Sequence, residues 1–166
     1  MSTMTKRLWR HLITDHGAVD RAFSRDSLGR VEHAVATGER RHGGQLCVAI
    51  EAALPLARVW QGITPRQRAL EVFGLLRVWD TEHNNGVLLY LMVADRDVEI
   101  VADRGIHALV GAAQWESICQ SIETAFRAGR YAEGIDAGVA AITELLALHA
   151  PGGGDRNELS DRPVIL

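Results

Sequence analysis

The sequence predicts an α/β fold, a three-layer α/β/α sandwich around a small mixed sheet. Three observations favour this class: two apolar runs separated by a helical segment, a third run that returns after a charged turn, and helical periodicity before and after these runs. A strand–helix–strand unit makes a right-handed crossover, so its two strands should be parallel, whereas the third strand should return antiparallel. The predicted order is α-α-β-α-β-β-α-α.

Composition limits the class of protein. With 166 residues, 47% hydrophobic and 23% charged, the chain is typical of one globular domain with a sizeable core. A formal net charge of −3, without a cluster of basic and aromatic residues, argues against nucleic-acid binding. The longest apolar run, residues 87–94, is too short to span a membrane, and no signal peptide is recognised. Cys47 and Cys119 lie in apolar patterns, as buried reduced thiols do, so we expect a cytoplasmic protein.

Two helices are expected in residues 1–39, packed on the domain that follows. The first has leucine, tryptophan and isoleucine in a helical rhythm, which Gly17 breaks. Ser27 can cap the second helix, which should end near Gly38. The α/β/α domain itself is expected to span residues 40–150.

The domain should begin with a strand and a well-marked helix. Residues 45–51 have large apolar side chains at alternate positions, which predicts a strand. A loop over residues 52–63 then leads to Thr64. Thr64 is expected to cap a helix, with Pro65 at the first helical position and Gln67 completing a capping box.

Two strands and two helices should complete the domain. The second strand, residues 87–93, is apolar throughout, which indicates a central strand covered on both faces. The third strand, residues 98–102, alternates and carries Glu99 outward. The first of two amphipathic helices stops at Gly129, and the second precedes residues 151–166, a loose tail whose apolar end can pin it to the domain.

Acidic and amide side chains are concentrated at the two ends of the second strand. A strand of this length spans roughly 20 Å, so the two groups lie too far apart to form one site. Because the third strand runs back, the starting end of the second strand gathers Asp80, Glu82, His83, Asn84, Asn85, Asp103 and His107. The opposite end holds Glu51, Asp95, Arg96 and Asp97.

Oxygen-rich side chains of this kind can bind Ca²⁺ or Mg²⁺. The first candidate set of ligands is Asp80, Asn84, Asn85 and Asp103, and the second candidate pair is Asp95 and Asp97. Ligands of open α/β sheets favour the carboxyl ends of parallel strands, which is the end of the second pair, whereas the first set offers more donors. The sequence leaves both ends open, and the same residue types also favour turns.

The chain contains three fragments of phosphatase motifs, and each departs from its pattern. Residues 95–97 (Asp-Arg-Asp) resemble the nucleophile loop of haloacid-dehalogenase phosphatases, but a strand follows them, so a charged hairpin turn is the better interpretation. Residues 41–43 (Arg-His-Gly) match the tripeptide of histidine phosphatases but precede a strand instead of following it. Cys119 has Ala125 where a cysteine phosphatase needs arginine. No catalytic nucleophile is identified.

Residues 84–89 (Asn-Asn-Gly-Val-Leu-Leu), followed by Asp95-Arg96 and by Gly105-Ile106, resemble the TPM domain family. This family occurs in thylakoid-lumen, bacterial and animal membrane-associated proteins. Residues 126–135 (Phe-Arg-Ala-Gly-Arg-Tyr-Ala-Glu-Gly-Ile) look like the family's segment of Phe, Gly-x-Tyr and a Gly-containing helix. The resemblance covers about residues 40–149, and the chain looks like the short cytoplasmic bacterial branch.

The resemblance implies an α/β/α sandwich, weak acid phosphatase activity, calcium binding, and roles in assembling or repairing membrane complexes. It also suggests a LemA-family protein or a TPM paralogue as a partner. This chain has Gln45 where relatives usually have Glu in the first strand. It has His107 and then Gly111-Ala112 where they often carry Glu and a Thr-Asp pair. The loss of these acids weakens the transfer of metal binding and catalysis.

Three hypotheses of function follow. The leading one is a cytoplasmic TPM-domain accessory protein that acts mainly by binding a protein partner, in membrane-complex assembly or in stress and quality control. The alternative is a divalent-cation-dependent enzyme similar to acid phosphatases, with weak phosphomonoester hydrolysis. The third is a structural domain with a surface that recruits a partner through Trp9, Trp60 or Tyr90.

Overall fold

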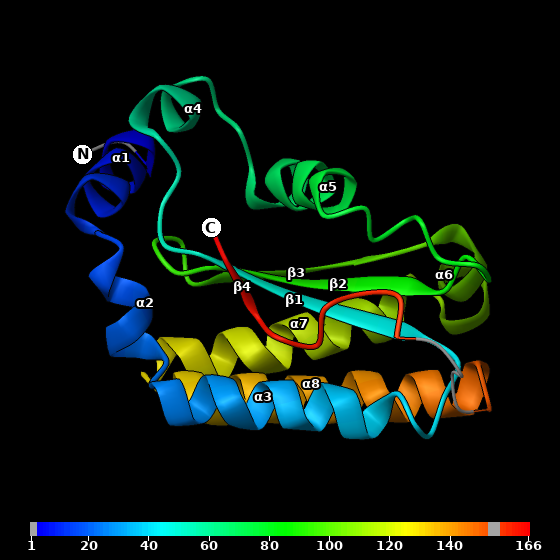
Figure 1. Cartoon of the computed structure of the whole chain (residues 1–166). Coiled ribbons are helices and arrows are strands. Elements are labelled where there is room, and N and C mark those ends of the chain that lie inside the picture. Colours follow the sequence, from blue (N-terminus) through cyan, green and yellow to red (C-terminus); the bar gives the residue numbers. More distant parts are fainter. Residues whose placement is uncertain (1–2, 153–156) are drawn as a thin grey trace.

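The chain folds as an α/β/α sandwich in a computed structural model that describes residues 3–152 and 157–166 (Figure 1). The sandwich confirms the fold class that the sequence predicts. In chain order the elements of the described residues are α1 (Thr3–Ile13), α2 (Gly17–Ala22), α3 (Arg25–Gly38), β1 (Gln45–Glu51), α4 (Leu56–Trp60), α5 (Pro65–Leu75), β2 (Gly86–Met92), β3 (Asp97–Ala102), α6 (Arg104–Val110), α7 (Ala112–Arg127), α8 (Tyr131–His149) and β4 (Val164–Ile165).

The middle layer is a mixed sheet with the strand order β3-β2-β1-β4. β1 and β2 are parallel, with Gln45 opposite Gly86, and β3 is antiparallel to β2, with Ala102 opposite Val87. The crossover predicted the parallel pair, and the charged turn predicted the antiparallel pair; both predictions are confirmed. The order leaves β3 as an edge strand, and this position creates the groove described below.

Helices cover both faces of the sheet (Figure 1). α3, α7 and α8 lie on one face, where alternate side chains of β1 such as Leu46 and Val48 enter the larger core. α4 and α5 lie on the other face, where Cys47 and Ala49 enter the smaller core. Every residue of β1 and β2 is therefore buried, which confirms the prediction of a covered central strand. None of the helices in the described residues is long and apolar enough to cross a membrane.

The start of α5 follows the expected capping box. The Thr64 side chain accepts a hydrogen bond from the Gln67 backbone N–H at 3.1 Å, and the Gln67 side chain accepts one from the Thr64 N–H at 2.9 Å. Pro65 occupies the first turn, where its missing N–H leaves no donor unsatisfied. This local prediction is confirmed because all its partners lie within four residues.

Four local expectations were wrong. Gly17 begins helix α2 and does not end the helical region. Ser24 caps α3 by accepting from the Ser27 N–H at 3.1 Å, while the Ser27 hydroxyl donates back to the Ser24 carbonyl at 2.8 Å. The expected loop over residues 52–63 contains α4, which starts after Pro55. A further helix, α6, follows β3, because the Asp103 side chain caps it by accepting from the next N–H at 2.6 Å.

The apolar end of the tail, which was expected to pin residues 151–166, forms a short strand on the sheet. β4 pairs parallel with β1, and the Leu166 N–H donates to the Ile50 carbonyl at 2.9 Å. The Gln45 side chain accepts hydrogen bonds from the N–H groups of Glu158 and Leu159 at 2.8 and 3.2 Å. Gln45 therefore holds the tail against the sheet, which gives this departure from the family pattern a structural role.

Candidate functional site

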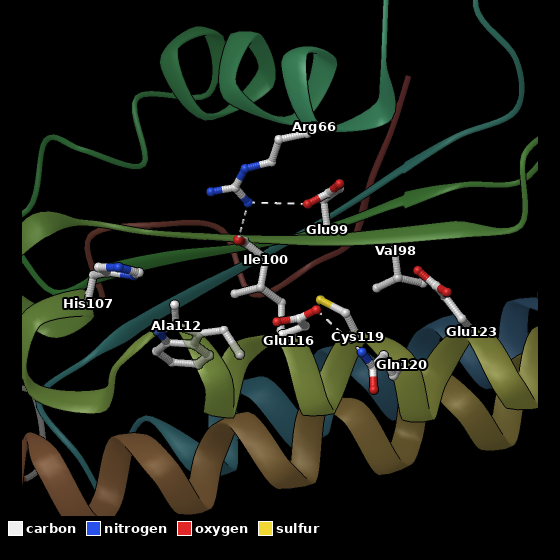
Figure 2. A pocket seen from close by; sticks show the side chains of 11 residues that line it. Arg66, Val98, Glu99, Ile100, His107, Ala112, Glu116, Cys119, Gln120 and Glu123 are labelled. Carbon is white, nitrogen blue, oxygen red and sulfur yellow. Dashed lines mark hydrogen bonds and ion pairs between the residues drawn. The ribbon is translucent and has the colours of Figure 1, made fainter.

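A groove runs along the free edge of β3, between α5 and α7 (Figure 2). Its volume is about 480 Å³. Charged and polar side chains from three elements meet there: Arg66 from α5, Glu99 from β3, and Glu116, Cys119 and Glu123 from α7. The groove is the strongest candidate for a functional site because polar groups from distant parts of the chain converge on it.

Side chains from α5 and α7 face the outward backbone groups of β3 at the centre of the groove. The Asp103 N–H donates to the Gly86 carbonyl, which sets the phase of pairing with β2, so the backbone groups of Ile100 face outward. Arg66 Nη1 donates to the Ile100 carbonyl at 2.6 Å (Figure 2). Cys119 of α7 lies on the other side of the groove and faces this part of the edge (Figure 2). The bond from Arg66 hinders pairing of the edge with another strand at Ile100.

Carboxylates dominate the electrostatics beside this edge. Burial raises the pKa of Glu99, while Arg66 Nη1, 3.2 Å from Glu99 Oε2, lowers it in part. Burial raises the pKa of Asp97 to about 7, and the charges of Glu99 and Glu123 add to the effect. Asp97 also has a buried Oδ1 without a hydrogen-bond partner among the described residues. The acidic character of the groove suits a ligand that carries positive charge.

The thiol in the groove is not a nucleophile at neutral pH. Burial, together with the charge of Glu99, raises the pKa of Cys119 to about 12. Burial also raises the pKa of Cys47 to about 11. Both cysteines are free thiols, as expected from their apolar surroundings. Because only the thiolate attacks, neither side chain can carry covalent catalysis at neutral pH.

Two arginines and a histidine of α1 hold Asp95 at the carboxyl end of the parallel strands. Arg7 Nε and Arg10 Nη2 each donate to its carboxylate at 2.9 Å, and His11 Nε2 lies 3.1 Å from Oδ2. Burial would raise the pKa of Asp95, but His11 and Arg10 hold it at about 2. The Leu54 N–H donates to His11 Nδ1 at 2.9 Å, so the ring proton is on Nε2, which faces Asp95. Both ring nitrogens are engaged, and His11 has no free nitrogen to act as a base.

A second buried network lies at the same end of the sheet. Glu51 accepts two hydrogen bonds from Arg68, at 2.9 and 3.0 Å, and one from the Tyr90 hydroxyl at 2.6 Å. Tyr90 is fully buried, which corrects the expectation that it belongs to a partner-recruiting surface. Trp9 and Trp60, in contrast, are more than half exposed. The network satisfies a buried carboxylate and has a structural role.

At the other end of the sheet lies the first candidate set of metal ligands. Two of its four members, Asp80 and Asn85, have their side chains engaged by other residues of the protein. Asp80 pairs with Arg77 at 2.5 Å, and the Asn85 side-chain amide donates to the Gly43 carbonyl. Asp103 caps α6 through Oδ1, whereas its buried Oδ2 has no hydrogen-bond partner among the described residues.

The structure offers little direct support for a divalent cation at these donors. In the described part of the chain, no three or more His, Cys, Asp or Glu side chains are placed to hold a metal ion. Calcium takes six to eight oxygen ligands, and among the described residues at this end of the sheet one buried carboxylate oxygen, Asp103 Oδ2, has no hydrogen-bond partner. Metal binding stays a prediction, which calorimetry with Ca²⁺ and Mg²⁺ can test.

Close backbone contacts explain why glycine stands at the end of the Asn-Asn-Gly segment and at position 105. A Cβ on Gly86 would collide with the Val78 carbonyl oxygen, and a Cβ on Gly105 would lie 2.6 Å from the Asn84 carbonyl oxygen. Asn84 itself has a positive φ of 52°. The segment therefore packs backbone against backbone where β2 begins and α6 follows β3.

Sequence reasoning found part of the groove and missed the rest. Of the residues expected near the start of β2, His107 lines it, and Glu99 of β3 was expected to face outward. Arg66, Glu116 and Glu123 were not predicted, because each lies on a helix that the sequence alone does not place beside β3. The acidic spacing on α7 could have indicated Glu116 and Glu123, whereas no local signal marks Arg66.

Comparison with known proteins gives one family and two similar folds. A model of the TPM domain family matches residues 19–145. The NMR structure of the BA42 protein from the psychrophilic bacterium Bizionia argentinensis is 25% identical, with a TM-score of 0.75, and the match covers 87% of this chain and 95% of that one. The NMR structure of the N-terminal domain of a protein from P. gingivalis is 17% identical, with a TM-score of 0.65 and coverage of 86% and 94%. The curated proteins give no match.

Proposed function

The chain belongs to the TPM domain family, and we propose that it is a cytoplasmic accessory protein that binds a protein partner in the β3 groove. The observation that carries the proposal is the groove itself, which brings charged side chains together around a thiol that cannot ionise near neutral pH. Such a site has groups for recognition and lacks a nucleophile with its base. Two free cysteines are in keeping with a reducing compartment.

The charges of the groove indicate which partner segment it takes. Glu116 is exposed at the groove, and Glu123, which is partly exposed there, pairs with Arg127 at 2.7 Å. Because Arg66 already occupies the outward carbonyl of Ile100, a partner strand cannot pair with the sheet there without displacing it. Recognition should therefore use side chains, and a segment that carries Lys or Arg fits best.

The rival function, a divalent-cation-dependent phosphatase, finds less support. It needs either a metal cluster or an activated nucleophile. The described residues provide no cluster of three metal-ligating side chains, and the pKa of Cys119 is raised to about 12. Partner binding is the function that the groove supports better.

Site-specific crosslinking tests the proposal whatever the identity of the partner. A photo-reactive amino acid at position 116 lies in the groove, and one at the exposed position 144 on α8 is the matched control. We expect a discrete crosslinked partner from position 116 and none from position 144, and loss of the product when the surrounding salt is raised. A LemA-family protein or a TPM paralogue is the first candidate to compare with the captured protein. Equal labelling from both positions would contradict the proposed site.

A further inference from the structure

Helix α1 contacts the domain mainly through charged and imidazole side chains, with Leu8 partly packed against the smaller core. Arg7 and His11 contact Asp95, and their side chains are 16% and 0% exposed. Three large apolar side chains of the same helix are more than half exposed: Trp9, Leu12 and Ile13. A helix on the surface of a globular protein normally has the opposite arrangement, with its apolar stripe on the core.

The neighbouring helix α4 also carries exposed apolar side chains. α1 packs against α4 at one corner of the molecule (Figure 1). Trp60 on α4 is 72% exposed, and Leu56 is also exposed. We call the five side chains the α1/α4 surface: Trp9, Leu12, Ile13, Leu56 and Trp60. Exposed tryptophans and aliphatic side chains grouped in this way mark an interaction surface.

The charge of α1 identifies the partner. The helix contains Lys6, Arg7 and Arg10 and no acidic residue, although the whole chain has a net charge of −3. Asp95 neutralises one of these three charges, so the helix keeps an excess of positive charge beside its exposed apolar side chains. A second copy of the chain would bring two such basic helices together, which like-charge repulsion disfavours.

We propose that the α1/α4 surface binds peripherally to an anionic lipid membrane. The helix lies in the plane of the interface, with Trp9 and Ile13 in the boundary between headgroups and acyl chains and Lys6 and Arg10 at the anionic headgroups. Tryptophan suits this depth because its ring is apolar and its N–H remains hydrated. The proposed surface belongs to α1 and α4, whereas the groove belongs to β3, α5 and α7.

Co-sedimentation with lipid vesicles tests this proposal. The purified chain is mixed with vesicles of phosphatidylcholine alone or of phosphatidylcholine with phosphatidylglycerol. We expect binding to the anionic vesicles only, and weaker binding at high salt. Lys6→Glu should lower the partition coefficient about tenfold or more, because each basic residue near an anionic surface contributes strongly to binding. Trp9→Ala should lower it several-fold.

Two matched variants control for general effects of charge and of tryptophan loss. Arg40→Glu reverses an exposed charge at the end of α3, and Trp79→Ala removes a tryptophan that is 51% exposed after α5. Both should bind like the wild type. Absence of binding, or equal binding to neutral vesicles, would overturn the proposal. A dimer in solution that Trp9→Ala dissociates would also overturn it, because a second copy would then cover the surface.

Discussion

Asp95 lies in the turn between β2 and β3, and Asp97 begins β3, two positions later. The same substitution at each should change stability in opposite directions. Burial would raise the pKa of Asp95, but its contacts with His11 and Arg10 hold it at about 2, below the ordinary value of 3.8. A difference of this size corresponds to about 2.5 kcal/mol. The lowered pKa means that this contribution is present above pH 4 and is lost as the pH falls toward 2.

Asp95→Asn should therefore lower the free energy of unfolding by about 2–3 kcal/mol at pH 7. For a chain of this size the loss corresponds to a fall in Tm of roughly 5–10 °C. The difference between the wild type and the variant should shrink as the pH falls from 5 toward 2, because the wild-type carboxylate is then protonated as well.

Asp97→Asn should have the opposite effect. Burial first, and then the charges of Glu99 and Glu123, raise the pKa of Asp97 to about 7 from 3.8. A raised pKa means that the stability is present below pH 4 and is lost as the pH rises through 7. The variant should match the wild type near pH 4 and exceed its stability by roughly 1–2 kcal/mol at pH 8, after allowance for screening by solvent.

Urea unfolding of the wild type and both variants between pH 3.5 and 8 gives the required free energies. The reasoning would be refuted if both substitutions lowered stability equally at pH 8. It would also be refuted if the deficit of Asp95→Asn remained constant as the pH fell, because the contacts with α1 would then not depend on the charge of Asp95.

Four further predictions concern stability and thiol reactivity. Gly86→Ala should cost about 3 kcal/mol or more in urea unfolding, because its Cβ would collide with a backbone carbonyl, and a cost below 1 kcal/mol would be evidence against that close approach. Gly74→Ala, in a helix with open space around the new Cβ, should instead stabilise the protein by roughly 0.5–1 kcal/mol, and destabilisation would contradict this. Tyr90→Phe should cost roughly 1.5–3 kcal/mol, because Glu51 loses a buried donor, and a neutral result would show that the hydrogen bond contributes little. Cys119 should react with a thiol reagent at pH 7.5 roughly a thousandfold more slowly than an ordinary thiol, and at the ordinary rate after unfolding in urea, whereas fast reaction of the native protein would contradict its raised pKa.

The parts of the fold that local chemistry specifies could be predicted from the sequence. The apolar runs predicted the three long strands, and the capping box at Thr64 predicted the start of α5. The short helices α4 and α6 were missed, because five to seven residues contain too few apolar positions to show a helical period. β4 has two residues and depends on pairing with β1, which no local pattern encodes.

The candidate site depends on contacts that are distant in sequence. Arg66 reaches the carbonyl of Ile100, 34 positions away, and α1 reaches Asp95 across more than 80 positions. Sequence reasoning separated the acids of the two ends of β2 correctly, because strand length alone decides that. It could not place the groove, because the groove requires β3 to be the edge strand and α5 and α7 to lie on either side of it.

The central claim is that the chain acts by binding and not by hydrolysis. The most direct measurement is the rate at which the purified protein hydrolyses p-nitrophenyl phosphate between pH 4.5 and 8, with Ca²⁺, Mg²⁺ or a chelator. Our account predicts a rate at background under all conditions, unchanged in Asp80→Ala and Asp103→Ala. A rate well above background that requires a divalent cation and is lost in either variant would contradict it.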